Sequence, residues 1–240
     1  MKHFKLDPKF PSLLFQSGLK ATLFFLQYLL KDYSGRTLSE CTDKAVALSG
    51  LAARIARALD CKENYGIFSL YLHRNFLWQR SDLQSTMERI KYKSRDVPSW
   101  SWMAYTGGIE FMNVDFGKLD LFKNLSFDEK DKQALITDVW EFQDCHLKEA
   151  EKAESEAARR EILDSCESER GWIMYDVEGK KDFLSERGVV VGRTGSGDQS
   201  DYYMLIVRQR GENKSEYERV GIGMVQKGYI SRQQADIHVF

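Results

Sequence analysis

The residues nearest to a catalytic pair are Cys145 and His146, a thiol beside an imidazole. A thiol activated by a neighbouring base could act as a nucleophile in acyl transfer or hydrolysis. The surrounding sequence favours a helix, however, and adjacent residues on a helix do not face each other. Cys166 and His238 lack the spacing of metal ligands. We therefore expect no catalytic dyad and no metal site. The isolated histidines are expected at the surface or its boundary: His3, His73 and His238.

A glycine-rich segment, Gly192 to Gly197, could cradle a phosphate group. A Walker loop would need a lysine after the last glycine, and a dinucleotide fingerprint would open a helix. Here a strand-like segment follows, so the pattern indicates a hairpin loop and no nucleotide cofactor. Gly221 and Gly223 lie inside another strand-like stretch, where glycine indicates a bulge or close packing.

Three tryptophans, Trp78, Trp100 and Trp102, could form a platform for a ligand. Because such rings bury roughly 150–250 Å² each, we expect them in the core instead. Four cations lie between Arg89 and Arg95 and could contact phosphate. A solvated loop fits this run better, because the rest of the chain provides no basic field.

Composition excludes several classes of protein. The 240 residues carry 35 Lys and Arg against 36 Asp and Glu, so the net charge is −1 and we expect no nucleic-acid partner. The best apolar run, Leu19 to Leu30, is shorter than the roughly 20 residues of a membrane span and does not resemble a signal peptide. Four well-separated cysteines are expected to be free thiols. These features favour a cytoplasmic protein without a membrane partner.

The hydrophobic pattern predicts an α+β fold in a single domain, 1–240, with a helical part over about 12–80. Apolar residues recur at helical spacing over 12–31 and 42–60, with Thr42 as a helix cap, and a third helix is expected over 66–79. An alternating pattern predicts a first β-hairpin over about 97–112.

The second half is expected to begin with a helical segment over about 127–170. Ser126 and Glu129 match a capping box, and the charged stretch 144–170 indicates an exposed helical insertion. A mostly antiparallel β part should follow over about 171–225. Its predicted strands, all rich in Val, Ile, Tyr and Met, are 172–177, 188–193, 202–209 and 217–225.

Several segments, in order, resemble the region after the HET domain of fungal heterokaryon-incompatibility proteins. Residues 42–52 are similar to that family's S-D-K-L-x-A-L-S-G-L-A, and 97–102 to its A-P-S-W-S-W. Further likenesses are 33–38, 65–68 with 76–78, and 217–223, which is similar to Y-E-R-V-G-V-G. Thr42, Ala45 and Phe68 depart from the family's usual Ser, Leu and Trp. The HET domain itself is missing, so the resemblance transfers no active residue.

Two hypotheses of function follow. The resemblance implies a non-catalytic regulatory or interaction module, acting in non-self recognition or cell-death signalling through a protein partner or self-association. The alternative is an enzyme with an unrecognised site, with fungal specialised metabolism as its suggested context. Its chemistry would have to gather around Cys145, His146, Arg193 and Arg219.

Overall fold

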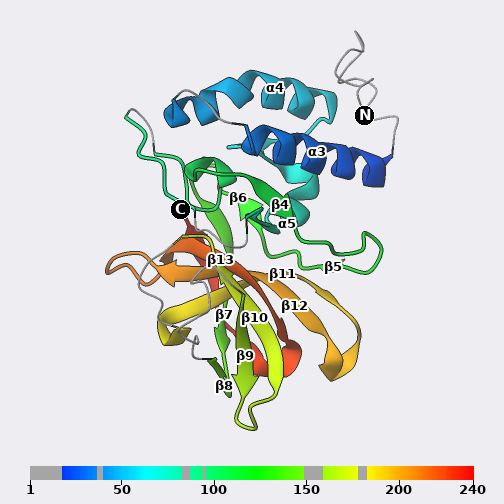
Figure 1. Cartoon of the computed structure of the whole chain (residues 1–240), viewed down its shortest axis with the longest axis vertical. Helices are drawn as coiled ribbons and strands as arrows, with labels where there is room; N and C mark the ends of the chain where they lie inside the picture. The colour runs from blue at the N-terminus through cyan, green and yellow to red at the C-terminus, as the bar shows by residue number, and fades with distance from the viewer. Residues whose placement is uncertain (1–17, 37–39, 83–86, 94–95, 149–158, 178–182) are drawn as a thin grey trace.

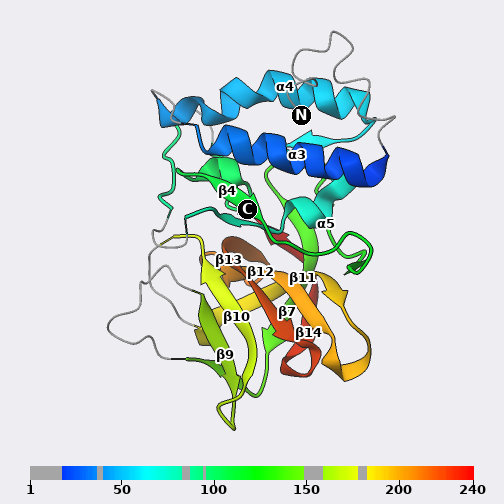
Figure 2. The same cartoon turned by 45° about the vertical axis from the view of Figure 1, so that its right-hand side comes forward.

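The structure is a computed structural model of the whole chain, and it describes residues 18–36, 40–82, 87–93, 96–148, 159–177 and 183–240. It has the expected α+β class. A layer of helices lies at one end of the molecule and a large, mainly antiparallel sheet makes up the rest (Figures 1 and 2). Among the described residues, no helix is both long enough and apolar enough to cross a membrane.

The helical layer consists of α3 (Leu19–Ser34) and α4 (Lys44–Ala58). Both confirm the predicted helical periodicity, and Gly35 follows the last residue of α3 as its C-cap. Residues 12–17 of the first predicted helix lie outside the described residues. The predicted cap at Thr42 is wrong, because a 3-10 turn, Cys41–Asp43, precedes α4 and no side chain caps the helix.

The predicted third helix over 66–79 is wrong. Glu63–Asn64 (β1) and Ile67–Phe68 (β2) form a tight hairpin, in which Tyr65 and Gly66 both have positive φ, 47° and 78°. A 3-10 turn, Ser69–Tyr71, and the single turn α5 (Leu72–Asn75) follow. The next segment is strand β3 (Trp78–Arg80). Local backbone geometry at the turn therefore overrides the helical spacing of the apolar residues.

The predicted hairpin over 97–112 is also wrong in its pairing. Its second half is strand β4 (Ile109–Phe111), but β4 pairs with β3, so that Trp78 lies opposite Phe111. Its first half turns at Pro98, whose carbonyl accepts from the Ser101 N–H, and continues as a 3-10 turn, Trp102–Ala104. Trp78, Trp100 and Trp102 are nevertheless fully buried, which confirms their assignment to the core.

The sheet includes far more of the C-terminal half of the chain than expected. Its order is β12-β11-β7-β14-β13-β10-β9-β8, and β12 also pairs with β13, so part of the sheet closes on itself. The short strands β5 (Asp120–Leu121) and β6 (Ser126–Phe127) add to β11 and β7. The long strands are β7 (Leu135–Phe142), β10 (Glu169–Tyr175), β11 (Glu186–Thr194), β12 (Asp201–Gln209), β13 (Glu216–Gln226) and β14 (Ile230–Val239), with β8 (Cys145–Leu147) and β9 (Arg160–Asp164) at the edge.

The predicted helical segment over 127–170 is therefore wrong wherever the structure describes it. Residues 149–158 lie outside the described residues, and the rest of the charged stretch contributes β8, β9 and the start of β10. In β7 burial alternates from Leu135 to Trp140, the period of a strand. The four strands predicted in the β part are confirmed, and β14 extends that part beyond residue 225.

The core joins the two parts. One cluster of buried residues runs from Leu26 of α3 and Ile55 of α4 through the tryptophans to Val189 and Leu205 of the sheet. A second cluster occupies the other face, where it includes Val190. Alternate residues of β11 thus serve different cores, and one face of the sheet supports the helical layer.

Candidate functional site

The structure separates Cys145 from His146, for a reason other than the expected one. The two residues lie on β8, where neighbouring side chains point to opposite faces. Burial raises the pKa of the Cys145 thiol to about 11, and its sulfur lies 3.8 Å from the Tyr229 carbonyl. His146 is exposed, 3.5 Å from Glu167. A thiol held protonated and turned away from the imidazole is a poor nucleophile.

The other candidate residues lie in separate places. Arg193 is half-buried and faces Asp120 at 3.7 Å, while His238 lies 3.4 Å from Asp128. Cys166 is exposed, and all four cysteines are unpaired. Burial lowers the pKa of His73. The described part of the chain contains no group of three or more His, Cys, Asp or Glu side chains placed to hold a metal ion.

The glycine motifs have the structural roles predicted for them. The loop with Gly195 and Gly197, both at positive φ, connects the antiparallel strands β11 and β12. A Cβ at Gly221 would lie 2.5 Å from the Met174 carbonyl oxygen, and one at Gly223 would lie 2.7 Å from that of Trp172. Both positions therefore need glycine for close packing of β13 on β10.

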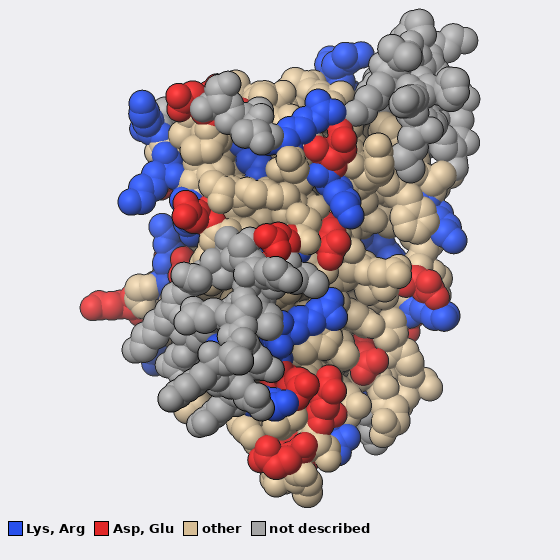
Figure 3. Space-filling model, viewed as in Figure 1, with Lys and Arg blue, Asp and Glu red and all other residues tan. Residues whose placement is uncertain are grey.

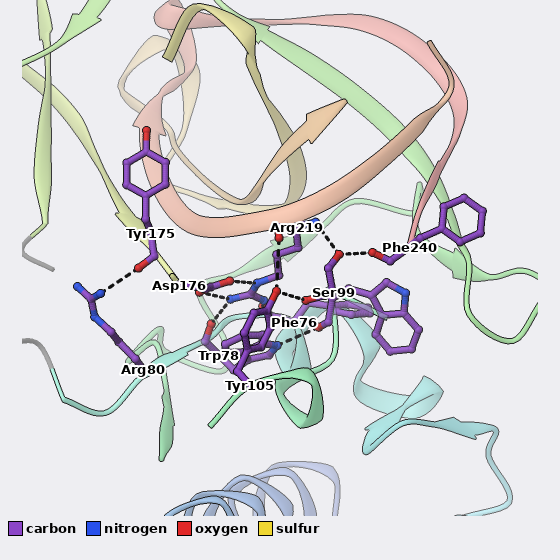
Figure 4. Close-up of polar contacts among 10 residues, drawn as sticks. Phe76, Trp78, Arg80, Ser99, Tyr105, Tyr175, Asp176, Arg219 and Phe240 are labelled. Atoms are coloured by element: carbon purple, nitrogen blue, oxygen red, sulfur yellow. Dashed lines mark hydrogen bonds and ion pairs between the residues drawn. The ribbon is translucent and has the colours of Figure 1, made fainter. Parts of the chain in front are cut away.

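Arg219 stands at the centre of a buried polar network between the sheet and the helical part (Figure 4). Its Nε donates to Asp176 Oδ2 at 2.8 Å, and its Nη2 donates to Asp176 Oδ1 at 3.3 Å. Further bonds run from Nη1 to the Phe76 carbonyl, 3.0 Å, and from Nη2 to the Trp78 carbonyl, 2.7 Å. The guanidinium also stacks on the Trp78 ring, 3.4 Å from its centroid. Such a saturated, water-excluded cation stabilises structure and is closed to substrates.

Ser99 links this network to the segment 97–102. Its hydroxyl accepts from the backbone N–H of Arg219 at 2.7 Å and donates to the carbonyl of Phe240. Tyr105 donates to the Ser99 carbonyl at 2.9 Å, and burial raises the pKa of that phenol. Trp78 Nε1 donates to the Trp100 carbonyl at 3.1 Å. The two segments 97–102 and 217–223, far apart in the sequence, therefore meet and hold each other (Figure 4).

Lys44 makes the corresponding connection for α4. Its side chain is buried, and its Nζ donates to the carbonyls of Tyr105 at 2.7 Å and Gly107 at 3.3 Å. The ammonium also lies 5.0 Å from the Trp102 ring centroid. Burial lowers the pKa of Lys44 to about 8, because the charged form loses hydration. The lysine of segment 42–52 therefore attaches α4 to the backbone at Tyr105 and Gly107.

A cavity of 510 Å³ opens beside α4, within the size range of ligand sites. Its walls come from the first turns of α4, the β1–β2 hairpin and the segment 92–103. Val46 of α4, exposed over 73 % of its surface, lines it on one side. Tyr65, Tyr92 and Met103 also line it.

The ionisable groups of this cavity differ in exposure. Glu63 is half-buried, whereas Asp43, Lys93 and Lys132 are exposed. Glu63 Oε1 accepts from the Gly66 N–H at 2.6 Å, and burial raises the pKa of the carboxyl. Among the described residues, no Lys or Arg lies within ion-pair distance of Glu63. A half-buried carboxylate without a cation has lost part of its hydration, and an opposite charge would compensate for that loss.

The cavity wall around Glu63 is held in place by close packing. A Cβ at Gly66 would lie 2.7 Å from Met103 Cε and 3.0 Å from Trp102 Nε1, so the hairpin turn packs directly on the 3-10 turn. Tyr92 donates from its hydroxyl to the Met103 carbonyl at 2.7 Å, and burial raises its pKa to about 12. The Tyr65 ring stacks edge-on against Trp100, 5.8 Å between centroids. The site is therefore built on a rigid scaffold.

No family model matches this chain, and neither the curated proteins nor the solved structures contain a match to it. The site is therefore described by its own geometry. Sequence reasoning did not single out Glu63, because a lone glutamate before a Tyr-Gly turn has no recognisable signature. Tyr65 entered only through the resemblance, and Lys93 only as part of the basic run.

Proposed function

We propose that this chain is a non-catalytic regulatory or interaction module, with a role like that of the region after the HET domain in non-self recognition or cell-death signalling. The supporting observation is the structural role of the segments that resemble the HET family. Ser99, Arg219 and Lys44, one from each of three such segments, join the helical layer to the sheet. Because these side chains are used to connect the two parts, we assign them the role of fixing the shape of the molecular surface and not that of acting on a substrate.

The arrangement of the candidate catalytic residues supports the same proposal. A site for covalent or acid–base catalysis needs a nucleophile, a base and a stabilising group that converge on one reacting atom. Cys145 and His146 point to opposite faces of an edge strand, Arg193 lies on a separate hairpin and Arg219 is buried. The four residues of the alternative, an enzyme in specialised metabolism, therefore do not converge on one site in the described structure.

The proposal predicts a protein partner or a second copy of the chain at the open face of the helical layer. The face of the molecule in Figure 3 mixes both signs of charge, so charge alone does not select a region there. Val46 is the most exposed large apolar residue of α3 and α4. Val46 also lines the cavity beside α4, so a substitution there probes this face of the helical layer.

The test compares two exposed apolar positions. Self-association is measured by sedimentation over a concentration series, and partner binding by quantitative capture with the full chain as bait. We expect Val46→Glu to abolish the association that the wild type shows, whereas Leu184→Glu, at a residue 84 % exposed in the β part, leaves it intact. A chain that stays monomeric and captures nothing reproducibly would contradict the proposal, as would equal behaviour of the two variants.

A further inference from the structure

The cavity beside α4 is an open concave site that contains one half-buried negative group. Tyr65, Tyr92 and Met103 line it with aromatic and polarizable side chains, and Glu63 is the least exposed of its Asp, Glu and Lys residues. Tyrosine faces attract cations because the ring quadrupole places negative potential above the ring. Carboxylate and aromatic groups together therefore favour a ligand with positive charge and apolar substituents.

Glu63 has unused capacity for such a ligand. A carboxylate can accept about four hydrogen bonds, and within the described part of the chain this one has a single donor, the Gly66 N–H. The raised pKa of Glu63 has burial as its main cause, with the Gly66 hydrogen bond opposing it. A bound cation would replace the hydration that the carboxylate has lost and would lower its pKa.

The lysines of the same cavity do not reverse this preference. Lys93 and Lys132 are exposed, so their ammonium groups remain hydrated and their field is screened by salt. Neither lies within ion-pair distance of Glu63. Their charges would weaken cation binding at long range and would disfavour ligands with two positive charges. Asp43, also exposed, opposes them.

We propose that this cavity binds an organic cation, an ammonium or guanidinium group with an apolar stem, with Glu63 as its counter-ion and the Tyr65 and Tyr92 rings as its walls. The proposal rests on the interaction role proposed above and specifies its ligand chemistry. The cation can belong to a Lys, Arg or methylated Lys side chain of a partner protein, or to a free small amine. Both sources would present a positively charged head group on an apolar stem to the site.

The first experiment titrates the full chain with butylammonium, butylguanidinium and choline, following the Met103 methyl resonance as a reporter in the cavity wall. The uncharged carbon isostere of choline and butyrate serve as controls for charge. We expect the cations to bind and shift this resonance, and the neutral and anionic probes to bind much more weakly. Glu63→Gln should lower the affinity about tenfold to a hundredfold, the range expected for losing a charged hydrogen bond.

Two further variants separate charge from folding. Glu212→Gln removes an exposed carboxylate in the β12–β13 loop and should leave the affinity unchanged. Lys93→Gln should strengthen cation binding. Gln at position 63 can still accept from Gly66, so the hairpin is retained. Absence of cation binding by the wild type, equal affinity of Glu63→Gln, or butyrate binding that Lys93→Gln abolishes would each overturn the proposal.

The last comparison identifies the source of the cation and keeps the two proposals apart. Short peptides with Lys, trimethyl-Lys or acetyl-Lys are titrated beside the free amines. Peptide affinity about tenfold or more above that of the matching amine assigns the site to a partner side chain, and equal affinity assigns it to a small amine. Failure of every cation while Val46→Glu still abolishes association would overturn the ligand assignment alone. Cation binding without any association would overturn the interaction role.

Discussion

Replacing Arg219 by Met should remove most of the stability that couples the helical layer to the sheet. The change strands the Asp176 carboxylate, which is 1 % exposed, and leaves the Phe76 and Trp78 carbonyls without their donors. Breaking one side of a buried ion pair costs about 3–5 kcal/mol, and an orphaned carbonyl adds about 1–3 kcal/mol before relaxation. Typical domains are stable by about 5–15 kcal/mol, so the variant should approach the limit of folding.

Urea unfolding with fitted slopes gives the measurement, supplemented by Asp176→Asn and the double variant. Asp176→Asn keeps the shape but leaves the buried Arg219 cation without its counter-ion, so we expect a loss of about 3–5 kcal/mol from the broken pair. The double variant should lose less than the sum of the two, because each change removes the same pair. Arg193→Met, at a half-exposed ion pair of 3.7 Å, is the matched control and should cost under about 1 kcal/mol. A loss under about 1 kcal/mol for Arg219→Met, or strict additivity, would refute the reasoning.

Three other predictions address separate parts of the fold. Trp102→Ala should lower the unfolding free energy by about 3–5 kcal/mol in urea, since the ring is fully buried, and a loss under about 1 kcal/mol would contradict the core assignment. The pKa of Lys44 is about 8 in the folded state against 10.5 in the unfolded chain. Its contribution to stability should therefore rise by up to about 3 kcal/mol as pH increases through that window, and Lys44→Met should remove this rise. Because the folded-state pKa of Glu63 is raised, its ionisation destabilises the fold above the ordinary value of 4.5. Glu63→Gln should thus melt no lower than the wild type at neutral pH, and any advantage should shrink below that value.

Local sequence patterns correctly predicted those helices and strands whose tertiary contacts favour the same secondary structure. In α3 and α4, apolar residues at spacings of three and four form the face that meets the tryptophans. The strands β10 to β13 consist of residues that favour strands and are connected, in two cases, by short glycine loops. In these segments tertiary contacts and local preference select the same structure.

The segment 135–142 shows why other elements were not predictable. Leu135, Val139 and Phe142 fit a helical stripe, and Leu135, Thr137 and Val139 equally fit one face of a strand. The deciding partner is β14, which pairs with β7 from about ninety residues further along the chain. The residues of the segment do not indicate that they pair with β14. The capping-box pattern at Ser126 instead favoured a helix, which is wrong.

The polar junction was only partly visible in the sequence, for a similar reason. The motifs around Ser99 and Arg219 stood out, but their contact spans 120 residues and depends on the packing of Trp78 between them. Glu63 did not stand out at all. Its significance comes from the burial that Tyr65 and Gly66 create around it, and no spacing encodes burial.

Buried charge therefore serves two different purposes in this protein. Arg219 is fully buried, and all three of its nitrogens are bonded to a counter-ion or to carbonyls, so it is closed to ligands and its removal should cost stability. Glu63 has one backbone donor and no cation in the described structure, so the folded state carries an electrostatic penalty that a ligand could relieve. Opposite signs are expected from the two neutralising substitutions: Arg219→Met destabilises the fold, whereas Glu63→Gln preserves or raises stability and weakens cation binding. If Glu63→Gln instead destabilised the chain at neutral pH, the carboxylate would be a structural group like Arg219, and the cavity would lose the argument that makes it a cation site.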